Sequence, residues 1–341
     1  METKTDACIL SDFHPFNDFH YKGCAYNALV PILGYYKRSP LHLFINDIAI
    51  YSTQDCASSV SVRYISQQSI EESLLELGIE MAPVAFNEQL LSGLQRAIRN
   101  NNPVMLWVDS YYQEMRRDTY GKMHWPHALV VHGFDNVSRQ CHIIEHKHRE
   151  TLSYTNTTIT FDCLERSYNG FRETFMGQEG IEQVHIFSDQ PSYVEFNMQD
   201  AERIPVLEDQ YARYLQFVEA HQEEILEGIA VLEEFASGLP EKFRSGEADP
   251  ALAKEWIEQF NHIVSGKQAE MLKVQQFNNP ALCEIVSSII LHWVAVRKIA
   301  ARYAFAKTLS DESVIEIQTG IEKICLEERQ YLNTLLSGCQ D

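Results

Sequence analysis

The sequence predicts an α+β domain followed by an all-helical domain. Residues 1–190 hold ten of the thirteen histidines and most of the short segments with strand-like alternation, whereas residues 191–341 carry long stretches of helical periodicity. The second part is also acidic, with 25 Asp and Glu against 13 Lys and Arg. A proline and several turn residues at 188–194 mark the change. We therefore expect two domains, 1–190 and 191–341.

Helices and strands alternate in the first part. The apolar positions of 24–36 recur with helical spacing, and Pro31 should kink or shorten that helix. Asn87 is expected to cap a helix that reaches residue 100. Further segments are expected to form a helix at 66–77, strands at 59–65, 79–84, 103–110, 157–161 and 180–187, and a hairpin of 127–134 with 141–146. Helices followed by a run of antiparallel strands are typical of an α+β fold.

The second part predicts a bundle of about four helices. Their expected ranges are 205–237, 250–276, 280–307 and 311–337, with breaks at Gly238-Leu239-Pro240 and Asn278-Asn279-Pro280. An apolar stripe runs along 281–304 through Ile285, Ile289, Trp293 and Val296. The stripe fits either the core of the bundle or contact with a second copy, so a homodimer stays open.

Composition excludes several classes of protein. The 341 residues carry 28 Lys and Arg against 48 Asp and Glu, a net charge of -20. Such acidity argues against nucleic acid as the main partner and suits a cationic small molecule or a basic partner. No apolar run reaches the roughly 18 residues of a membrane span. The N-terminus lacks a signal-peptide pattern and the eight cysteines form no CxxC pair, so we expect free thiols in a reducing cytoplasm.

Cys24 is the first candidate for chemistry. It follows Gly23 and opens the predicted helix 24–36. A thiol at a helix N-terminus feels the positive end of the helix dipole, which lowers its pKa and favours the thiolate. Glycine beside it lets a substrate carbonyl approach closely. The alternative is a buried cysteine that packs as a small apolar side chain.

The predicted hairpin supplies a base and its orienting acid. With the turn centred near residue 136, His127 lies opposite Glu145, and opposed side chains share one face of a sheet about 5 Å apart. A carboxylate there holds an imidazole in one tautomer and stabilises its charged form. A slip of one residue would place His146 there instead. The alternative is a structural histidine with an incidental charge pair.

Three short stretches resemble a known family. They are GCAYNAL at 23–29, PVMLWVDSYY at 103–112 and HWPHALVVHGFD with HIIE at 124–145. Together they resemble the N-terminal domain of the butirosin biosynthesis protein H family, which is papain-like and similar to the bacteriocin-processing C39 peptidases. The resemblance covers about residues 12–190. It implies a papain-like fold with Cys24 as nucleophile, His127 as base and Glu145 as third member, where the family usually has Asp.

The resemblance also implies an activity. Members of this family transfer an acyl group from a carrier-protein thioester to an amine, by way of an acyl-cysteine. We therefore expect an amide-forming acyltransferase of secondary metabolism, with a polyamine, diamine or aminoglycoside as acceptor. No cofactor is expected beyond the phosphopantetheine arm that carries the donor. The alternatives are a papain-like cysteine peptidase or amidase, and a non-catalytic papain-like binding protein.

Further residues are candidates for substrate binding. Papain-like peptidases usually place a Gln shortly before the cysteine to complete the oxyanion hole, and this chain has none there. The Cys24 N–H is one candidate donor, and Asn17, His20 or Tyr21 is the second. Asp109, which ends the strand 103–110, is expected to bind the acceptor amine. Tyr111 and Tyr112 are expected to wall the pocket, although strand-end packing explains all three equally well.

Two other patterns bear on partners and metals. An acidic carrier protein needs a local basic patch, for which the candidates are Lys37-Arg38, Arg116-Arg117 with Lys122, and Lys147 with Arg149. The histidines at 124, 127, 132, 142, 146 and 148 offer metal-ligand atoms. However, strand alternation separates residue 145 from 142, 146 and 148, and no HExxH or CxxC motif accompanies them. We expect no metal.

Overall fold

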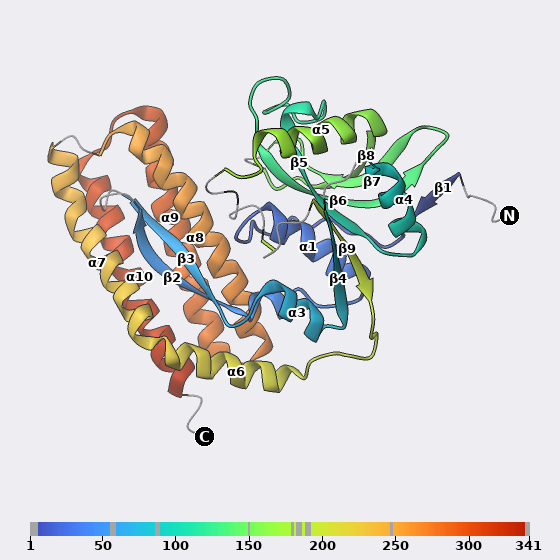
Figure 1. Cartoon of the computed structure of the whole chain (residues 1–341). Coiled ribbons are helices and arrows are strands. Elements are labelled where there is room, and N and C mark those ends of the chain that lie inside the picture. Colours follow the sequence, from blue (N-terminus) through green and yellow to red (C-terminus); the bar gives the residue numbers. More distant parts are fainter. Residues whose placement is uncertain are drawn as a thin grey trace. The chain divides into compact units, whose positions relative to one another are not determined.

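The protein has a mixed α+β architecture with two compact units (Figure 1). The structure, a computed structural model, describes residues 6–54, 59–85, 89–148, 151–178, 181, 186–187, 192–245 and 248–337. Unit 1 comprises Met1–His42 and Gln68–Pro205, and unit 2 comprises Leu43–Gln67 and Val206–Asp341. This division differs from the single expected boundary at residue 190, because residues 43–67 belong with the helices of the second part.

Unit 1 is built around one antiparallel sheet. Its strands are β1 (Ala7–Ile9), β4 (Ile79–Val84), β5 (Val104–Asp109), β6 (Pro126–Asp135), β7 (Gln140–Glu145), β8 (Thr155–Thr160) and β9 (Tyr193–Met198). They lie in the order β4-β9-β5-β6-β7-β8, and β1 pairs with the last residues of β6. Every residue of β5 is buried, which explains its continuous apolar run. The long strand β6 therefore lies in the middle of the sheet.

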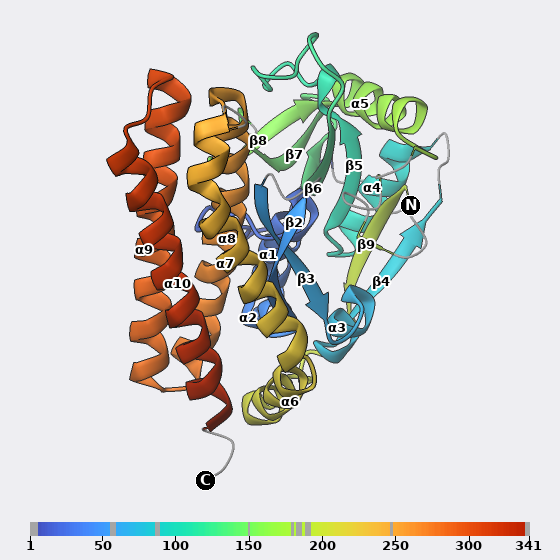
Figure 2. The same cartoon turned by 90° about the vertical axis from the view of Figure 1, so that its left-hand side faces the viewer.

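Helices cover both faces of this sheet. They are α1 (Cys24–Tyr35), α3 (Ile70–Glu76), α4 (Leu90–Arg99) and α5 (Phe161–Thr174), with a 3₁₀ turn, η1, at Ser110–Tyr112. Helix α1 packs against β6 and α5 packs against β5. Figures 1 and 2 show α1 and α5 on opposite sides of the sheet. Pro31 lies inside α1, which runs unbroken past it and is not shortened.

Some predicted elements of unit 1 differ from the structure. The expected helix at 66–77 begins only at Ile70, because Ser69 and Glu72 form a capping box there. Asn87 and most of the expected strand 180–187 lie outside the described residues. The sheet instead gains β9, which the turn residues before it concealed, and whose Val194 and Phe196 are fully buried.

Unit 2 contains five helices among the described residues. They are α6 (Leu207–Ala220), α7 (Gln222–Ser245), α8 (Pro250–Gln276), α9 (Pro280–Ala306) and α10 (Asp311–Ser337). The expected first helix is thus two helices that divide at His221. The expected break at 238–240 is wrong, since α7 continues through Pro240. The expected break before Pro280 is confirmed, with Asn279 as the cap of α9. No helix among the described residues combines the length and apolar character needed to span a bilayer.

A β-hairpin completes the core of unit 2. Strands β2 (Asp47–Gln54) and β3 (Ser59–Ser66) pack against α7 and α8. Ile48, Ile50 and Val60 are buried in one apolar cluster with the helices, and so is the expected stripe of α9 with Trp293 at its centre. The stripe therefore packs internally. One apolar face of a two-stranded ribbon must be covered, and the helices provide that cover.

Buried polar contacts also hold the hairpin. The Tyr51 hydroxyl donates to Glu328 and accepts from the Trp293 indole N–H at 3.1 Å. Glu328 in turn pairs with the Lys267 ammonium, whose nitrogen is 2.7 Å from Oε2. All four side chains are buried, so each charge has a partner of opposite sign within the core.

Two glycines in α7 give a matched test of this packing. A Cβ at Gly228 would lie 2.9 Å from the Tyr51 carbonyl oxygen, whereas a Cβ at Gly238 would meet nothing within 4 Å. We expect Gly228→Ala to lower the free energy of unfolding by about 1–3 kcal/mol. Gly238→Ala should raise it by up to about 1 kcal/mol through helix propensity. Urea denaturation measures both, and equal effects would contradict the close approach of α7 to β2.

Candidate active site

Cys24 opens α1, and the chain before it is held in place by that helix. The buried side chain of Asn27, one turn into α1, donates to the Phe19 carbonyl and accepts from the Tyr21 N–H, each at 3.0 Å. Lys22 adopts the left-handed region with φ 55°, an uncommon conformation for a non-glycine residue. The Asn27 side chain thus fixes the segment that leads into the thiol. Cys24 itself is partly exposed.

The thiol of Cys24 lies against the first residues of β6. The Ala128 N–H donates to its sulfur at 3.4 Å, and His127 lies near enough to lower the pKa of the thiol. Burial raises the pKa of the Cys24 thiol, but the hydrogen bond and charge of His127 and the Ala128 N–H together lower it below its ordinary 9.0. The arrangement therefore favours a thiolate paired with an imidazolium.

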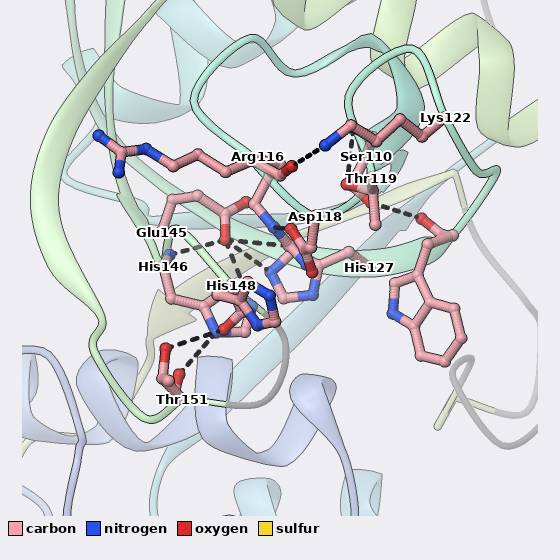
Figure 3. Close-up of polar contacts among 12 residues, drawn as sticks. Ser110, Arg116, Asp118, Thr119, Lys122, His127, Glu145, His146, His148 and Thr151 are labelled. Atoms are coloured by element: carbon pink, nitrogen blue, oxygen red, sulfur yellow. Dashed lines mark hydrogen bonds and ion pairs between the residues drawn. The ribbon is translucent and has the colours of Figure 1, made fainter.

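Glu145 lies on the other side of the imidazole. Its Oε1 is 3.2 Å from His127 Nε2, and both side chains are buried (Figure 3). Burial lowers the pKa of His127, but the charge of Glu145 and the bond to Cys24 raise it to about 9. Burial raises the pKa of Glu145, yet the charge of His127, followed by that of Arg116, lowers it to about 2. The three residues predicted from sequence are thus brought together.

The register that joins them is not the predicted one. Near the turn, Phe134 pairs with Cys141, but beyond an irregularity between Val131 and Gly133, Val131 pairs with Ile143. Continued to the strand end, this register places Glu145 opposite Leu129, which shares the face of His127. Without the bulge, His146 would occupy that face instead. The predicted register is two residues off, and an even shift preserves the face.

Arg116 is a member of the site that sequence reasoning placed elsewhere. It is fully buried, its Nη1 lies 3.4 Å from Glu145 Oε1, and it binds both oxygens of Asp118 at 3.3 Å. It holds the Glu145 carboxylate in place, and so the expectation that it forms part of a docking patch is wrong. Arg38 is likewise buried, against the carbonyl oxygens of Leu77 and Ala201. Arg149 lies outside the described residues.

The imidazole of His127 is the first of three stacked rings. His127 stacks on His146 with ring centroids 5.1 Å apart, and His146 stacks on Tyr154 at 4.3 Å. Burial, and then the charge of His127, lowers the pKa of His146 to about 4. The middle ring is therefore neutral around pH 7, so it adds no charge that would repel the imidazolium.

Asn17 supports this stack and is not available as an oxyanion donor. Its side-chain amide donates to the Tyr154 carbonyl at 2.9 Å and accepts from the Tyr154 N–H at 2.8 Å. Tyr21 is buried, with its N–H on Asn27. Of the three expected donors, the partly buried His20 remains, beside the N–H of Cys24 at the start of α1.

The expected role of Asp109 is also corrected. Its carboxylate is fully buried and accepts from the N–H groups of Tyr111 at 3.0 Å and Trp125 at 3.1 Å, while its other oxygen pairs with His124. This carboxylate holds the loop that follows β5. Both of its oxygens are already bound by groups of this chain, so it is not available to an acceptor amine. Tyr111 stacks on His124 at 4.3 Å. Tyr112 packs on Gly170, where a Cβ would approach its ring to 2.2 Å.

Sequence reasoning missed the exposed loop that precedes His127. Residues 120–125 are all exposed and include Tyr120, Met123 and Trp125, at 44, 36 and 38%. The Trp125 backbone is fixed by Asp109 and by two bonds from Ser110 to its carbonyl, at 3.0 and 3.1 Å. Trp125 immediately precedes β6 and is two residues before His127. A tryptophan two residues before the predicted base, in HWPH, was the available signal.

The histidines form a different cluster from the one considered for a metal. Ligand-type atoms of His127, Glu145 and His146 lie within 4.8 Å of one another, whereas the ring of His142 lies 6.2 Å from that of His132. Arg116 adds positive charge to the same carboxylate, which opposes a divalent cation there. We interpret Glu145 as the opposite charge beside His127 and His146 as its stacking partner.

Sequence comparisons identify no relatives. The chain matches no protein-family model, and no curated protein shows significant sequence similarity to it.

The pKa shifts predict the reactivity of Cys24. Iodoacetamide should label it at a pH below that at which an ordinary thiol reacts, and His127→Ala should move this profile upward, since burial and the charge of Glu145 would then oppose only the Ala128 N–H. Mass spectrometry of tryptic peptides measures both. Cys141, whose pKa burial raises to about 12, is the internal control. A Cys24 that reacts no faster than Cys8 or Cys283 would contradict the ion pair.

Variants of the neighbouring Arg116 and Arg117 distinguish the positioning role of Arg116 from the effect of removing a surface charge. Arg116→Met leaves Glu145 and Asp118 with an uncompensated buried charge, which should lower the free energy of unfolding by about 3–5 kcal/mol. Arg117→Met removes an exposed cation and should change it by less than about 0.5 kcal/mol. Thermal and urea unfolding provide the comparison. Similar values for the two variants would exclude the proposed role of Arg116.

Proposed function

We propose that unit 1 is a papain-like thiol acyltransferase that forms amides through an acyl-Cys24 intermediate. The observation that carries the proposal is the Cys24–His127–Glu145 arrangement: a thiol at a helix N-terminus, an imidazole that lowers the pKa of that thiol, and a buried carboxylate 3.2 Å from the Nε2 of the imidazole. These are the parts that a covalent acyl transfer needs. The family resemblance supports a papain-like fold and a carrier-bound thioester as the donor.

The first half of the reaction loads the enzyme. The Cys24 thiolate attacks the carbonyl carbon of the donor thioester, and the resulting oxyanion is stabilised by the Cys24 N–H and a second donor, for which His20 is the candidate. The intermediate collapses with cleavage of the donor C–S bond. The imidazolium of His127 gives its proton to the departing thiolate, which leaves as a thiol. The acyl group remains on Cys24 and His127 is neutral.

The second half releases the amide. A neutral amine attacks the acyl-Cys24 carbonyl, and His127 accepts the proton that the amine loses. The C–S bond to Cys24 breaks, the amide leaves, and the thiolate–imidazolium pair is restored. Glu145 and Arg116 stay charged throughout and hold the imidazole. Water in place of the amine would give hydrolysis by the same steps, which is the peptidase or amidase alternative.

Charge and the exposed loop favour an amine over water. The chain carries a net charge of -20, which attracts a polycationic acceptor at long range. Trp125, two residues before His127 and 38% exposed, is a side chain of the type that attracts ammonium groups. Three exposed cations on the same unit suit the phosphate of the donor arm: Arg117, Lys122 and Lys147. They are linked by bonds from Lys122 Nζ to the Arg117 carbonyl at 2.6 Å and from the Arg117 N–H to the Lys147 carbonyl.

Intact-protein mass spectrometry tests the function. The protein is mixed with acyl thioesters of N-acetylcysteamine, coenzyme A and carrier proteins, with and without a diamine or an aminoglycoside. We expect one acyl adduct, mapped to Cys24, and discharge by amine about tenfold or more faster than by water, with an amide as product. Cys24→Ala should give no adduct, and Cys283→Ala, which alters a partly buried thiol in unit 2, should behave as wild type.

Each other outcome has a definite meaning. Discharge that is equally fast in water, with no amide, would replace the transferase by a hydrolase. No adduct with any donor, together with a Cys24 of ordinary reactivity, would exclude both enzymes and favour the binding-protein alternative.

A further inference from the structure

The outer face of α9 has an unusual charge for its surroundings. Residues 191–341 hold 25 acids and 13 bases, yet the 26 residues from 285 to 310 contain no acid and four bases: Arg297, Lys298, Arg302 and Lys307. Lys298, Arg302 and Lys307 are exposed. A concentrated positive segment within an acidic protein creates a local field opposite in sign to that of the whole molecule.

Apolar side chains share this face. Leu291, Ala295, Lys298, Arg302 and Phe305 recur every three or four residues and are all exposed, and we name them the α9 outer stripe. Leu291 is 66% exposed and Phe305 is 82% exposed, whereas the opposite face of α9 carries the buried Trp293 and Val296. The internal stripe explains the folding of α9, but nothing in the core of unit 2 requires the outer one.

The surface is hollowed at the end of the stripe. Lys298, Ala301, Arg302, Phe305 and Ala306 line a shallow hollow of about 870 Å³. A second crevice of about 610 Å³ lies at the same end of α9. It is lined by Phe243, Tyr303, Leu309, Val314 and Ile315, with the cations Arg244 and Lys307 and the acid Asp311, among others. An exposed apolar site next to cations is typical of a protein contact with an apolar centre and a charged rim.

The charges indicate what binds there. Within the described part of the chain, Lys298 and Arg302 form no ion pair, so their charge is available to a partner. Nucleic acid would be repelled by the net charge of -20. In a symmetric contact between two copies, the cations of the stripe would face one another. An acidic protein surface with an apolar centre fits both the charge and Phe305.

We propose that the α9 outer stripe is a docking surface for an acidic protein. Building on the proposed function, we identify this acidic partner as the carrier protein that delivers the acyl thioester. Lys298 and Arg302 attract the carrier electrostatically, and Phe305 forms the apolar centre of the contact. The surface that binds the carrier therefore belongs to unit 2, whereas Cys24 belongs to unit 1.

Two donors that share one arm provide the test. A coenzyme A thioester and a carrier-protein thioester bear the same phosphopantetheine, but only the second bears the protein. The carrier used is the one that acylates Cys24 in the wild type. We expect Lys298→Glu with Arg302→Glu, and separately Phe305→Ser, to raise KM for the carrier-bound donor about three- to tenfold. KM for the coenzyme A donor should be unchanged. The carrier effect should shrink as salt rises from about 50 to 300 mM.

Control variants and measurements distinguish an effect of local charge from a loss of folding, and an effect on docking from an effect on catalysis. Lys254→Glu removes an exposed cation of α8 and should leave both donors unaffected. Thermal unfolding checks that the stripe variants fold. Equal effects on both donors, or none on the carrier, would overturn the proposal, and so would a wild-type dimer that the variants dissociate.

If no thioester acylates Cys24, the proposed function fails on its own. Fluorescence anisotropy with a labelled acidic carrier protein then decides whether the stripe binds. Binding that the double variant weakens would support the docking surface, and equal or absent binding would overturn it.

Discussion

An enclosed carboxylate determines how the site of unit 1 is built. Glu145 is 2% exposed, and an ionised carboxylate at such a position needs charge and hydrogen bonds from the protein around it. Arg116, His127 and the His146 N–H supply them at 3.4, 3.2 and 2.8 Å. The same contacts leave one nitrogen of the imidazole toward Glu145 and the other for the thiol. The reactivity of Cys24 therefore depends on an acid that does not touch it.

Unit 2 also encloses carboxylates that are paired with cations, and there the pairs stabilise the fold. Its core encloses Glu270 and Glu328, each paired with a lysine: Lys273 at 2.9 Å and Lys267 at 2.7 Å. Tyrosine hydroxyls complete both carboxylates, from Tyr214 at 2.8 Å and from Tyr331 for Glu270, and from Tyr51 for Glu328. Paired buried charges hold the hairpin and helices in unit 2, whereas in unit 1 they surround the imidazole of His127.

Local patterns explain how far the sequence could be interpreted. The helix that begins at Cys24 and the strands that carry His127 and Glu145 follow from periodicity and turn residues within about 20 positions. The register does not, because the bulge near Gly133 arises where the neighbour of β6 changes from β5 to β1. The right face was still predicted, since a shift of two residues returns each side chain to the same side.

Contacts between distant segments were beyond such reasoning. Arg116 was expected on the surface because its partner, Glu145, is 29 residues away, and nothing in RRD marks it as buried. Asn17 was expected to face a substrate, but its amide matches the backbone of Tyr154 across 137 residues. Trp125 was missed because apolar residues in a loop are common. These residues became interpretable only once the sheet had brought the segments together.

The hairpin at 43–67 has a consequence for how the protein can be divided. The chain passes between the two units at three places, since unit 2 takes its first segment from between two segments of unit 1. A fragment that starts at 206 would lack Ile48, Ile50 and Tyr51 and would expose the helix surfaces that they cover. During synthesis the hairpin emerges first and must wait for more than 150 residues before α7 and α8 are made. The two units are therefore not interchangeable modules, and an insertion of this kind links the folding of unit 1 to that of its helical companion.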